Sequence, residues 1–218
     1  LRRWRLTVEI ALWSLLVAVL VLPLTALALT ALVPAAGVAL DAHSATLENF
    51  RFVLFEHAAA RRAFGNSFTL STAAAVTIVV IAIPLAYFLV WRQSRLLRFV
   101  NVVTEIPYAV PGVVLAIAAI LLFVKPIPVL GISIYNTVWI ILFCYLARFL
   151  VLGLRPVVSG YHQLDRTLEE ASQIAGARLA RRLRTIILPL IAPTAAAGAL
   201  LIFLTAFNEL TLSALLWS

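Results

Sequence analysis

Several residue types are scarce in this sequence, and each scarcity excludes a class of protein. The only cysteine is Cys144, so the chain cannot build a disulfide framework of its own. The only lysine, Lys125, is followed by proline, so the Gly-x-x-x-x-Gly-Lys-Ser/Thr loop that binds nucleotide phosphates is absent. The three histidines, which are His43, His57 and His162, are not paired at the spacing of metal ligands. We therefore predict neither a catalytic nucleotide site nor a bound metal or cofactor in this chain.

Methionine is missing altogether, and the sequence begins at Leu1. No polar tail follows its final residues, NELTLSALLWS. Because a natural chain starts with methionine, we expect residues 1–218 to be a piece of a longer protein. Within that piece no internal repeat and no low-complexity linker marks a boundary, so we expect a single domain.

Charged residues are also scarce: they make up 12% of the chain, whereas 64% of the residues are apolar. A soluble domain has about 25% charged and roughly 45–50% apolar residues. Several apolar runs approach or exceed the roughly 18–20 residues that cross a bilayer as a helix. The runs are continuous and do not alternate as the strands of a membrane barrel do. The composition therefore predicts an all-α membrane protein.

Five apolar runs are candidate spans, and a sixth is expected to lie outside this piece. A break is predicted near the start of the third run, between Pro107 and Pro111, because proline removes a backbone donor. The loop of residues 34–66 contains most of the charges between the first two runs and is expected to hold a short helix. The predicted spans are Ile10–Val33, Phe68–Val90, Ile106–Val124, Tyr135–Leu154 and Leu190–Phe207.

The arginines lie at the ends of the apolar runs, which is the pattern of membrane orientation rather than of a groove for nucleic acid. The N-terminus, the 91–98 loop and the 155–188 loop together hold twelve arginines, including Arg2 and Arg3. The opposite side holds four basic residues. Since basic residues accumulate on the cytoplasmic side, the N-terminus and the 155–188 loop are predicted to be cytoplasmic. Despite the net charge of +8, no nucleic-acid partner is predicted.

The cytoplasmic loop contains two amphipathic segments. Leu164, Leu168, Ala171 and Ala175 form one helical stripe, and Glu169 and Ser172 are expected on other faces. Gly176 follows, where a tight bend or a positive φ is expected. A second stripe continues with a basic opposite face that can lie on membrane lipid, and Pro189 is expected to end or kink this helix. The second stripe consists of Leu179, Leu183, Ile186 and Leu190.

Two plain interpretations of this loop stay open. It can be a solvated connection, although a connection between spans needs only a few residues. Glu170, three residues after Thr167, also fits a capping box at a helix N-terminus. Against both, two amphipathic helices separated by one glycine form a compact projection that suits a socket on a partner.

The loop resembles the EAA loop of ABC importer permeases, which reads Glu-Ala-Ala, three residues, Gly, nine residues, Ile, one residue, Leu-Pro. The spacing matches throughout, and the one departure is serine in place of the second alanine. Residues 66–218 are also similar to the ferric-iron branch of these permeases, with EIPYAVPGVVLAIA and AFNELTLSALLW as the similar stretches. The positions that match the motif are Glu170, Ala171, Ser172, Gly176, Ile186, Leu188 and Pro189. We add the neighbouring Glu169 to the residues of the candidate coupling loop.

This resemblance implies a type I ABC importer transmembrane domain in the bacterial inner membrane, forming one permease half. We expect it to be the second half of a fused permease, because two halves are often joined in one chain in this branch. It implies three partners: a cytoplasmic ATPase dimer that binds ATP, a second permease half, fused or separate, and an extracytoplasmic binding protein. Glu170 rather than Glu169 would pair with a basic group of the ATPase. Ferric iron is the favoured substrate, and thiamine, phosphonate and polyamine are alternatives. No enzyme activity of the chain itself is implied.

Three polar residues in or near the spans are candidates for the translocation path, because intramembrane polar groups are costly. Glu105 lies near the start of the third span, and Asn208 and Glu209 follow the fifth. Each also has a plain interpretation as an interfacial residue. The two glutamates would be proton carriers in the competing function, an ion-coupled secondary transporter, which has no need for a socket-fitting loop.

Overall fold

The computed structural model describes residues 4–35, 37–41, 44–92, 94–126, 131 and 133–217. In this part of the chain every regular element is a helix. Four helices are long and apolar enough to cross a membrane, and one bent pair can supply a fifth crossing. The predicted all-α membrane fold is therefore confirmed. Arg2, Arg3 and His43, which entered the sequence argument, lie outside the described residues.

The helices divide into two compact units, Leu1–Gly65 and Asn66–Ser218. The first unit contains α1 (Arg5–Ala31), α2 (Glu48–Arg51) and the π-helical turn η1 (Phe52–Glu56). The Asn49 side chain donates hydrogen bonds to Ala31 O at 3.1 Å and to Val33 O at 2.8 Å. These bonds satisfy carbonyls at the end of α1 that have no partner within the helix. The short helix expected in the 34–66 loop is thus present and is tied back to α1.

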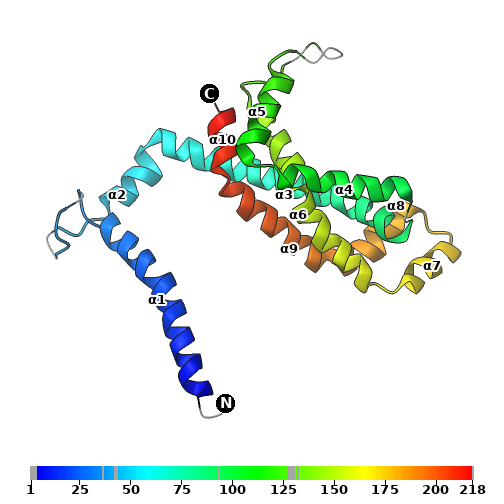
Figure 1. Ribbon diagram of the computed structural model, residues 1–218, viewed down its shortest axis with the longest axis horizontal. Helices are drawn as coiled ribbons and strands as arrows, with labels where there is room; N and C mark the ends of the chain where they lie inside the picture. Colours follow the sequence, from blue (N-terminus) through cyan, green and yellow to red (C-terminus); the bar gives the residue numbers. More distant parts are fainter. Residues whose placement is uncertain are drawn as a thin grey trace. The chain divides into compact units, whose positions relative to one another are not determined.

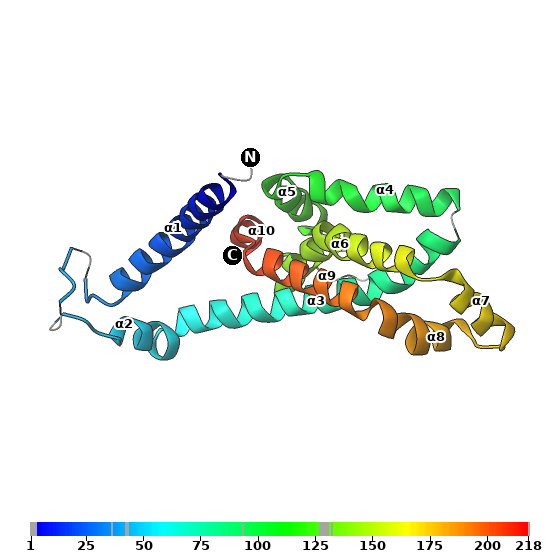
Figure 2. The ribbon, with the colours of Figure 1, turned by 90° about the horizontal axis from the view of Figure 1, so that it is seen from below.

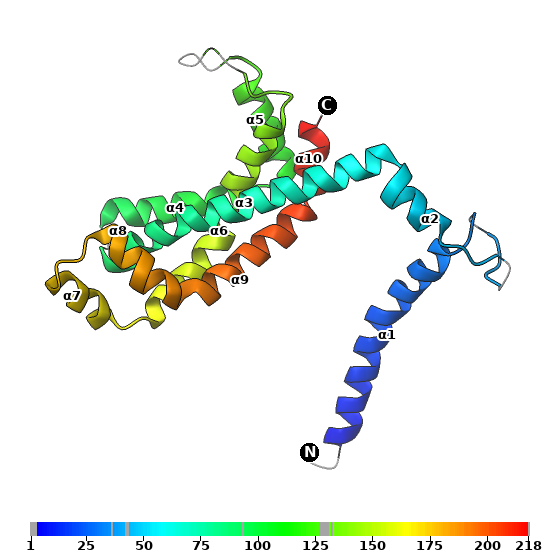
Figure 3. The same ribbon diagram turned by 180° about the vertical axis from the view of Figure 1, so that it is seen from behind.

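The second unit is built on α3 (Ala58–Trp91), α6 (Val138–Gln163) and α9 (Leu188–Phe207), which lie side by side (Figures 1 and 3). Glycines allow their close approach. A Cβ atom on Gly153 of α6 would meet Ile78 of α3 at 2.7 Å and Ile202 of α9 at 2.8 Å. A Cβ atom on Gly198 of α9 would lie 3.4 Å from the Gly153 carbonyl oxygen. Gly198, which belongs to the run of small residues at 192–199, is therefore part of a helix-packing contact, as small residues commonly are in membranes.

The break expected near the start of the predicted third span, Ile106–Val124, is present, but the helix before the break begins earlier, at Arg95. The segment forms α4 (Arg95–Ala109) and α5 (Gly112–Phe123), which are bent by 107° at the break. Val110 and Pro111 are extended, with ψ of 135° and 139°. Proline disfavours helical geometry in the residue before it, so Pro111 accounts for the break, whereas Pro107 stays inside α4.

The boundaries predicted for the polar loop, 155–188, also need correction. Helix α6 does not end at Leu154 but continues to Gln163. After α7 (Arg166–Ile174), helix α8 (Leu179–Arg182) leads through the π-helical turn η2 (Leu183–Ile187) directly into α9. In η2 the Leu188 N–H reaches Leu183 O, so the wider turn comes just before Pro189, which has no N–H to donate. Pro189 therefore does not end the helix, which continues from α8 through η2 into α9. The non-helical part of the predicted 155–188 loop is limited to the short stretches before and after α7.

The two ends of the second unit carry different elements. Helix α7 projects at one end, beyond the C-terminal end of α6 (Figure 2). The short helix α10 (Leu210–Leu216) packs beside α5 at the opposite end (Figures 1 and 2). The sequence motif of the polar loop and the polar residues at the end of α9 are therefore separated by the length of the helices.

Candidate functional site

Helix α7 has a defined beginning and end. The Asp165 carboxylate accepts a hydrogen bond from the Thr167 N–H at 2.9 Å, which caps the N-terminus. The backbone N–H and the hydroxyl of Thr167 lower the pKa of Asp165, because they stabilise the charged form. The N-cap is thus Asp165, so the capping box of Thr167 and Glu170 that the sequence allowed is wrong.

The end of α7 is a turn that requires glycine. The N–H of Gly176 donates to Gln173 O at 2.9 Å, and the N–H of Ala177 donates to Ser172 O at 3.1 Å. These two bonds form a Schellman motif. Gly176 has φ of +76°, as the sequence predicted, and a Cβ atom there would meet nothing within 4 Å. Gly176 is therefore needed for its backbone conformation and not for lack of space.

The inward face of α7 carries a buried ionic network around Glu169, which is 4% exposed. Glu169 Oε1 accepts hydrogen bonds from Arg182 Nη1 of α8 at 2.6 Å and from the Tyr87 hydroxyl of α3 at 2.6 Å. A third bond comes from Gln173 Nε2 at 3.0 Å. The side chains of Glu169 and Arg182 are only 5% and 11% exposed, so solvent screens their attraction weakly. This network joins α7 to both α3 and α8.

Sequence reasoning placed the faces of α7 the wrong way round. Glu169 and Ser172 were expected to point away from the packing stripe, yet both are buried, and the Ser172 hydroxyl donates to Glu169 O at 2.7 Å. The predicted apolar stripe faces outward instead: Leu168 is 47% exposed and Ala171 is also exposed. The polar network occupies the position that an apolar stripe holds in an ordinary amphipathic helix.

The outward face of α7 is apolar with one charged pair. Glu170 Oε1 lies 3.3 Å from Arg166 Nε one turn earlier, and both side chains are more than half exposed. Ile174 is 89% exposed, the highest exposure of any large apolar residue among those described. We call this surface the outer face of α7; it comprises Arg166, Leu168, Glu170, Ala171, Ile174 and Ala175.

The remaining motif residues lie in η2 and at the start of α9. Ile186 is half-buried, whereas Leu188 and Pro189 are exposed. The buried residue of this turn is their neighbour Ile187, which is 2% exposed and packs in the core of the second unit. The structure therefore brings Glu169, Glu170, Ala171, Ser172 and Gly176 together around α7, while Ile186, Leu188 and Pro189 lie along the adjoining helix.

The three candidate path residues do not form one cluster. Glu105 of α4 pairs with Arg155 of α6 at 3.1 Å. Asn208 Nδ2 donates to Leu204 O at the end of α9, and the Glu209 carboxylate caps α10 by accepting the Leu212 N–H at 3.2 Å. Each residue thus has a local partner.

Arg148 was missed by the sequence reasoning, which counted arginines only in the loops. It lies in the middle of α6, a candidate span, and its Nε and Nη1 atoms are buried with no hydrogen-bond partner among the described residues. A Cβ atom on Gly112 would overlap Arg148 Nη1 and would lie 3.4 Å from Glu209 Oε1. Arg148, Gly112 and Glu209 therefore meet at the α4–α5 bend. An arginine inside an apolar run was the available signal, because intramembrane charges mark functional sites.

In the described ranges of the chain, no three His, Cys, Asp or Glu side chains are grouped closely enough to hold a metal ion.

Comparison with known proteins places this helical membrane fold in a family. Residues 78–218, more than half of the chain, match the family described as "binding-protein-dependent transport system inner membrane component". The chain belongs to this family of ABC transporter permeases, and the fold is the type I ABC importer transmembrane domain. The members are membrane subunits of transporters, and they work in general with an ATPase and a substrate-binding protein.

Individual relatives support this assignment. A probable ABC transporter permease of Sinorhizobium fredii is 31% identical over 213 residues, which is 95% of this chain and 37% of the relative. A Fe(3+)-transport system permease of Haemophilus influenzae is 30% identical over 72% of this chain and 30% of the relative. A trehalose/maltose permease of Thermococcus litoralis is 46% identical over 74 residues, which is 34% of this chain and 27% of the relative. The chain thus spans about a third of the length of these three relatives.

Proposed function

We propose that this chain is the membrane-spanning permease half of an ATP-driven importer that receives its substrate from an extracytoplasmic binding protein. The observation that carries the proposal is the two-sided construction of α7. Its inward face is bound to the spans through Glu169, and its outer face presents apolar side chains that the described residues leave exposed. A helix of this kind suits a socket on a second protein.

The second protein is a cytoplasmic ATPase dimer, which supplies the ATP chemistry. Leu168 and Ile174 enter an apolar cleft of the ATPase, and Glu170 exchanges its exposed partner Arg166 for a cation of the cleft. When ATP closes the dimer, the cleft moves α7. Because Glu169 is bonded to Arg182 and Tyr87, the displacement passes to α8 and α3 rather than being lost in a loose loop.

The orientation follows from charge. With twelve arginines on one side and four basic residues on the other, α7 and the N-terminus of the chain lie in the cytoplasm. The membrane is the bacterial inner membrane, and a second permease half, fused or separate, completes the pathway. The α5–α10 end then faces outward, and Arg148 and Glu209 lie at an outer gate near the α4–α5 bend.

Ferric iron is the substrate we favour, because a relative that matches most of this chain is named as a Fe(3+)-transport permease. The shorter match to a trehalose/maltose permease covers about a third of the chain and carries less weight. Selection of the ion is assigned to the binding protein, so the pathway needs no metal site of its own.

The test is transport by the complete permease reconstituted in vesicles with its ATPase and binding protein. Uptake of labelled ferric iron should require both proteins and ATP, and labelled thiamine, phosphonate and polyamine serve as competing substrates. Uptake of thiamine, phosphonate or polyamine instead of iron would overturn the substrate only. Uptake that follows an ion gradient without the ATPase would overturn the class in favour of a secondary transporter.

A further inference from the structure

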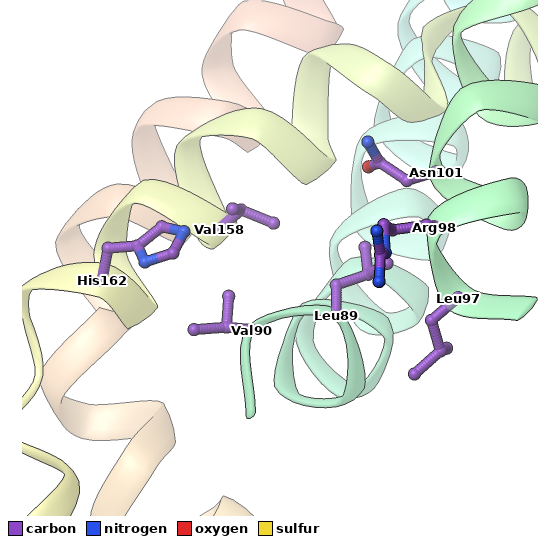
Figure 4. A pocket seen from close by; sticks show the side chains of 7 residues that line it. All are labelled: Leu89, Val90, Leu97, Arg98, Asn101, Val158 and His162. Atoms are coloured by element: carbon purple, nitrogen blue, oxygen red, sulfur yellow. The ribbon is translucent and has the colours of Figure 1, made fainter. Parts of the chain in front are cut away.

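A cavity at the α7 end of the second unit plays no part in the proposed coupling. Its volume is about 260 Å³, far above the ~30 Å³ that one water molecule occupies. Figure 4 shows that side chains of α6 and α4 lie on its opposite sides, with the end of α3 between them. Three of the seven lining residues are polar or charged, and the full lining consists of Leu89, Val90, Leu97, Arg98, Asn101, Val158 and His162.

The cavity lies along the contact between α4 and α6, which we call the seam. Elsewhere in the seam a basic residue is paired with an acidic one. One step along the seam, Glu105 of α4 neutralises Arg155 of α6. At the cavity, Arg98 lies about two turns before Glu105 on α4, and the α6 residue on the opposite side is His162 rather than a carboxylate. Among the described residues, the seam therefore ends in an exposed arginine with no carboxylate opposite it.

The acidic side chains of this end of the unit are already engaged. Glu105 pairs with Arg155, and Asp165 caps α7. Glu169 is held by Arg182, and Glu170 pairs with Arg166. The segment 91–104 contains three arginines and no acidic residue. Arg98 is exposed and has no carboxylate partner among the described residues, so an anion from outside the chain can reach its guanidinium.

The apolar part of the lining restricts what this anion can be. Leu89, Val90, Leu97 and Val158 offer contacts to hydrocarbon beside the guanidinium and amide donors of Arg98 and Asn101. A free phosphate ion would leave these apolar walls facing water, which is unfavourable. An anionic lipid satisfies both parts, because basic pockets between membrane helices on the cytoplasmic side bind anionic headgroups.

We propose that this cavity binds the phosphate group of an anionic membrane lipid, with Arg98 and Asn101 donating hydrogen bonds to the phosphate oxygens. The start of an acyl chain lies on the four apolar residues. This binding goes beyond the transport function proposed above and requires only that the chain is embedded in a bilayer, so transport and lipid binding can fail separately.

The test is native mass spectrometry of the full-length permease, purified in detergent and titrated with phosphatidylglycerol, phosphatidylcholine or inorganic phosphate. Arg98→Gln removes the cation, and Arg95→Gln is the matched control on the same helix, outside the lining. We expect phosphatidylglycerol to bind wild type and Arg95→Gln equally, and Arg98→Gln about fivefold more weakly, the effect of one basic side chain at a membrane surface.

Three results would overturn the proposal. Equal phosphatidylglycerol binding by wild type and Arg98→Gln would exclude the guanidinium as its partner. Equal binding of phosphatidylcholine and phosphatidylglycerol would mean that the cavity does not select an anion. Displacement of phosphatidylglycerol by an equal concentration of inorganic phosphate would identify a site for a soluble ion instead of a lipid.

Discussion

The two faces of α7 differ more than their sequence suggests. Glu169 and Glu170 are adjacent and chemically identical, yet Glu169 is buried against Arg182 and Tyr87, while Glu170 is exposed beside Arg166. On the inward face, polar groups make the contacts that hold the helix. On the outer face, apolar groups such as Ile174 are left in solvent.

The polar inward face and the apolar outer face of α7 have different roles, although the helix has only nine residues. The inward face fixes α7 on the spans, because a buried ionic network is costly to break once it is formed. The outer face keeps the apolar surface that a partner can cover. Substitutions on the two faces should therefore fail in different ways, by loss of stability on one and by loss of docking on the other.

The largest effect is expected from Glu169→Gln. Removing one partner of a buried pair leaves the Arg182 charge uncompensated, at about 3–5 kcal/mol. The variant should unfold at a lower temperature in detergent and should transport poorly even where the ATPase still binds. Differential scanning fluorimetry of the purified permease measures the first effect. In the double variant Glu169→Leu with Arg182→Leu, much of this loss should be recovered; an equally unstable double variant would argue against the ion pair as the cause.

The next effect is expected from Glu170→Gln, which acts on the outer face. Within the chain the exposed pair with Arg166 contributes only about 0.3–0.5 kcal/mol, so the thermal stability should hardly change. In the complex, loss of a charge partner in the cleft should cost roughly 2–5 kcal/mol, which is about thirtyfold or more in ATPase affinity. Surface plasmon resonance between permease and ATPase measures this change. Undiminished affinity would show that Glu170 has no cation in the cleft.

A smaller effect is expected from Gly176→Val, which changes the turn between α7 and α8. A β-branched residue at φ of +76° is strained by about 1–3 kcal/mol. ATPase binding should weaken while the spans still insert. Gly65→Ala, on a helix with open space around the glycine, is the matched control and should be harmless. Normal uptake by Gly176→Val would exclude a requirement for this turn.

The smallest effect is expected at the N-cap and depends on pH. Hydrogen bonds from Thr167 lower the pKa of Asp165 in the folded chain. The resulting stabilisation is present above the ordinary carboxyl pKa and is lost as the pH falls through the lowered value. Asp165→Asn keeps a capping oxygen without titrating. The protection of residues 164–178 from hydrogen–deuterium exchange, measured relative to the intrinsic exchange rate at each pH, should fall in acid for wild type and not for Asp165→Asn, and an equal fall in both would contradict this account.

Much of the fold could be predicted from composition, because apolar runs of spanning length and arginine-rich ends are direct consequences of the bilayer. The α4–α5 break was expected from Pro107 and Pro111, but only Pro111 produces it. The 107° bend could not be foreseen, because proline fixes the local backbone and neighbouring helices set the angle.

The site was harder to predict than the fold. The spacing of the motif and the positive φ of Gly176 follow from local rules. The inward face of α7 could not be predicted in this way. The rule for amphipathic helices assumes that the buried face is apolar, whereas this face is held by hydrogen bonds from Tyr87 and Arg182, which are distant in sequence, to Glu169. Arg148 was overlooked because its significance depends on being buried beside Gly112 of another helix.

The most direct test of the central claim is protection of single cysteines on α7 by the ATPase. In a Cys144→Ala background, Leu168→Cys and Ile174→Cys place thiols on the outer face, and Thr185→Cys places an exposed thiol outside it, on η2. Labelling rates with a maleimide are compared in inverted vesicles with and without the ATPase. The account predicts that the ATPase slows labelling at positions 168 and 174 by at least tenfold and leaves position 185 unchanged. Equal labelling of positions 168 and 174 with and without the ATPase would contradict it.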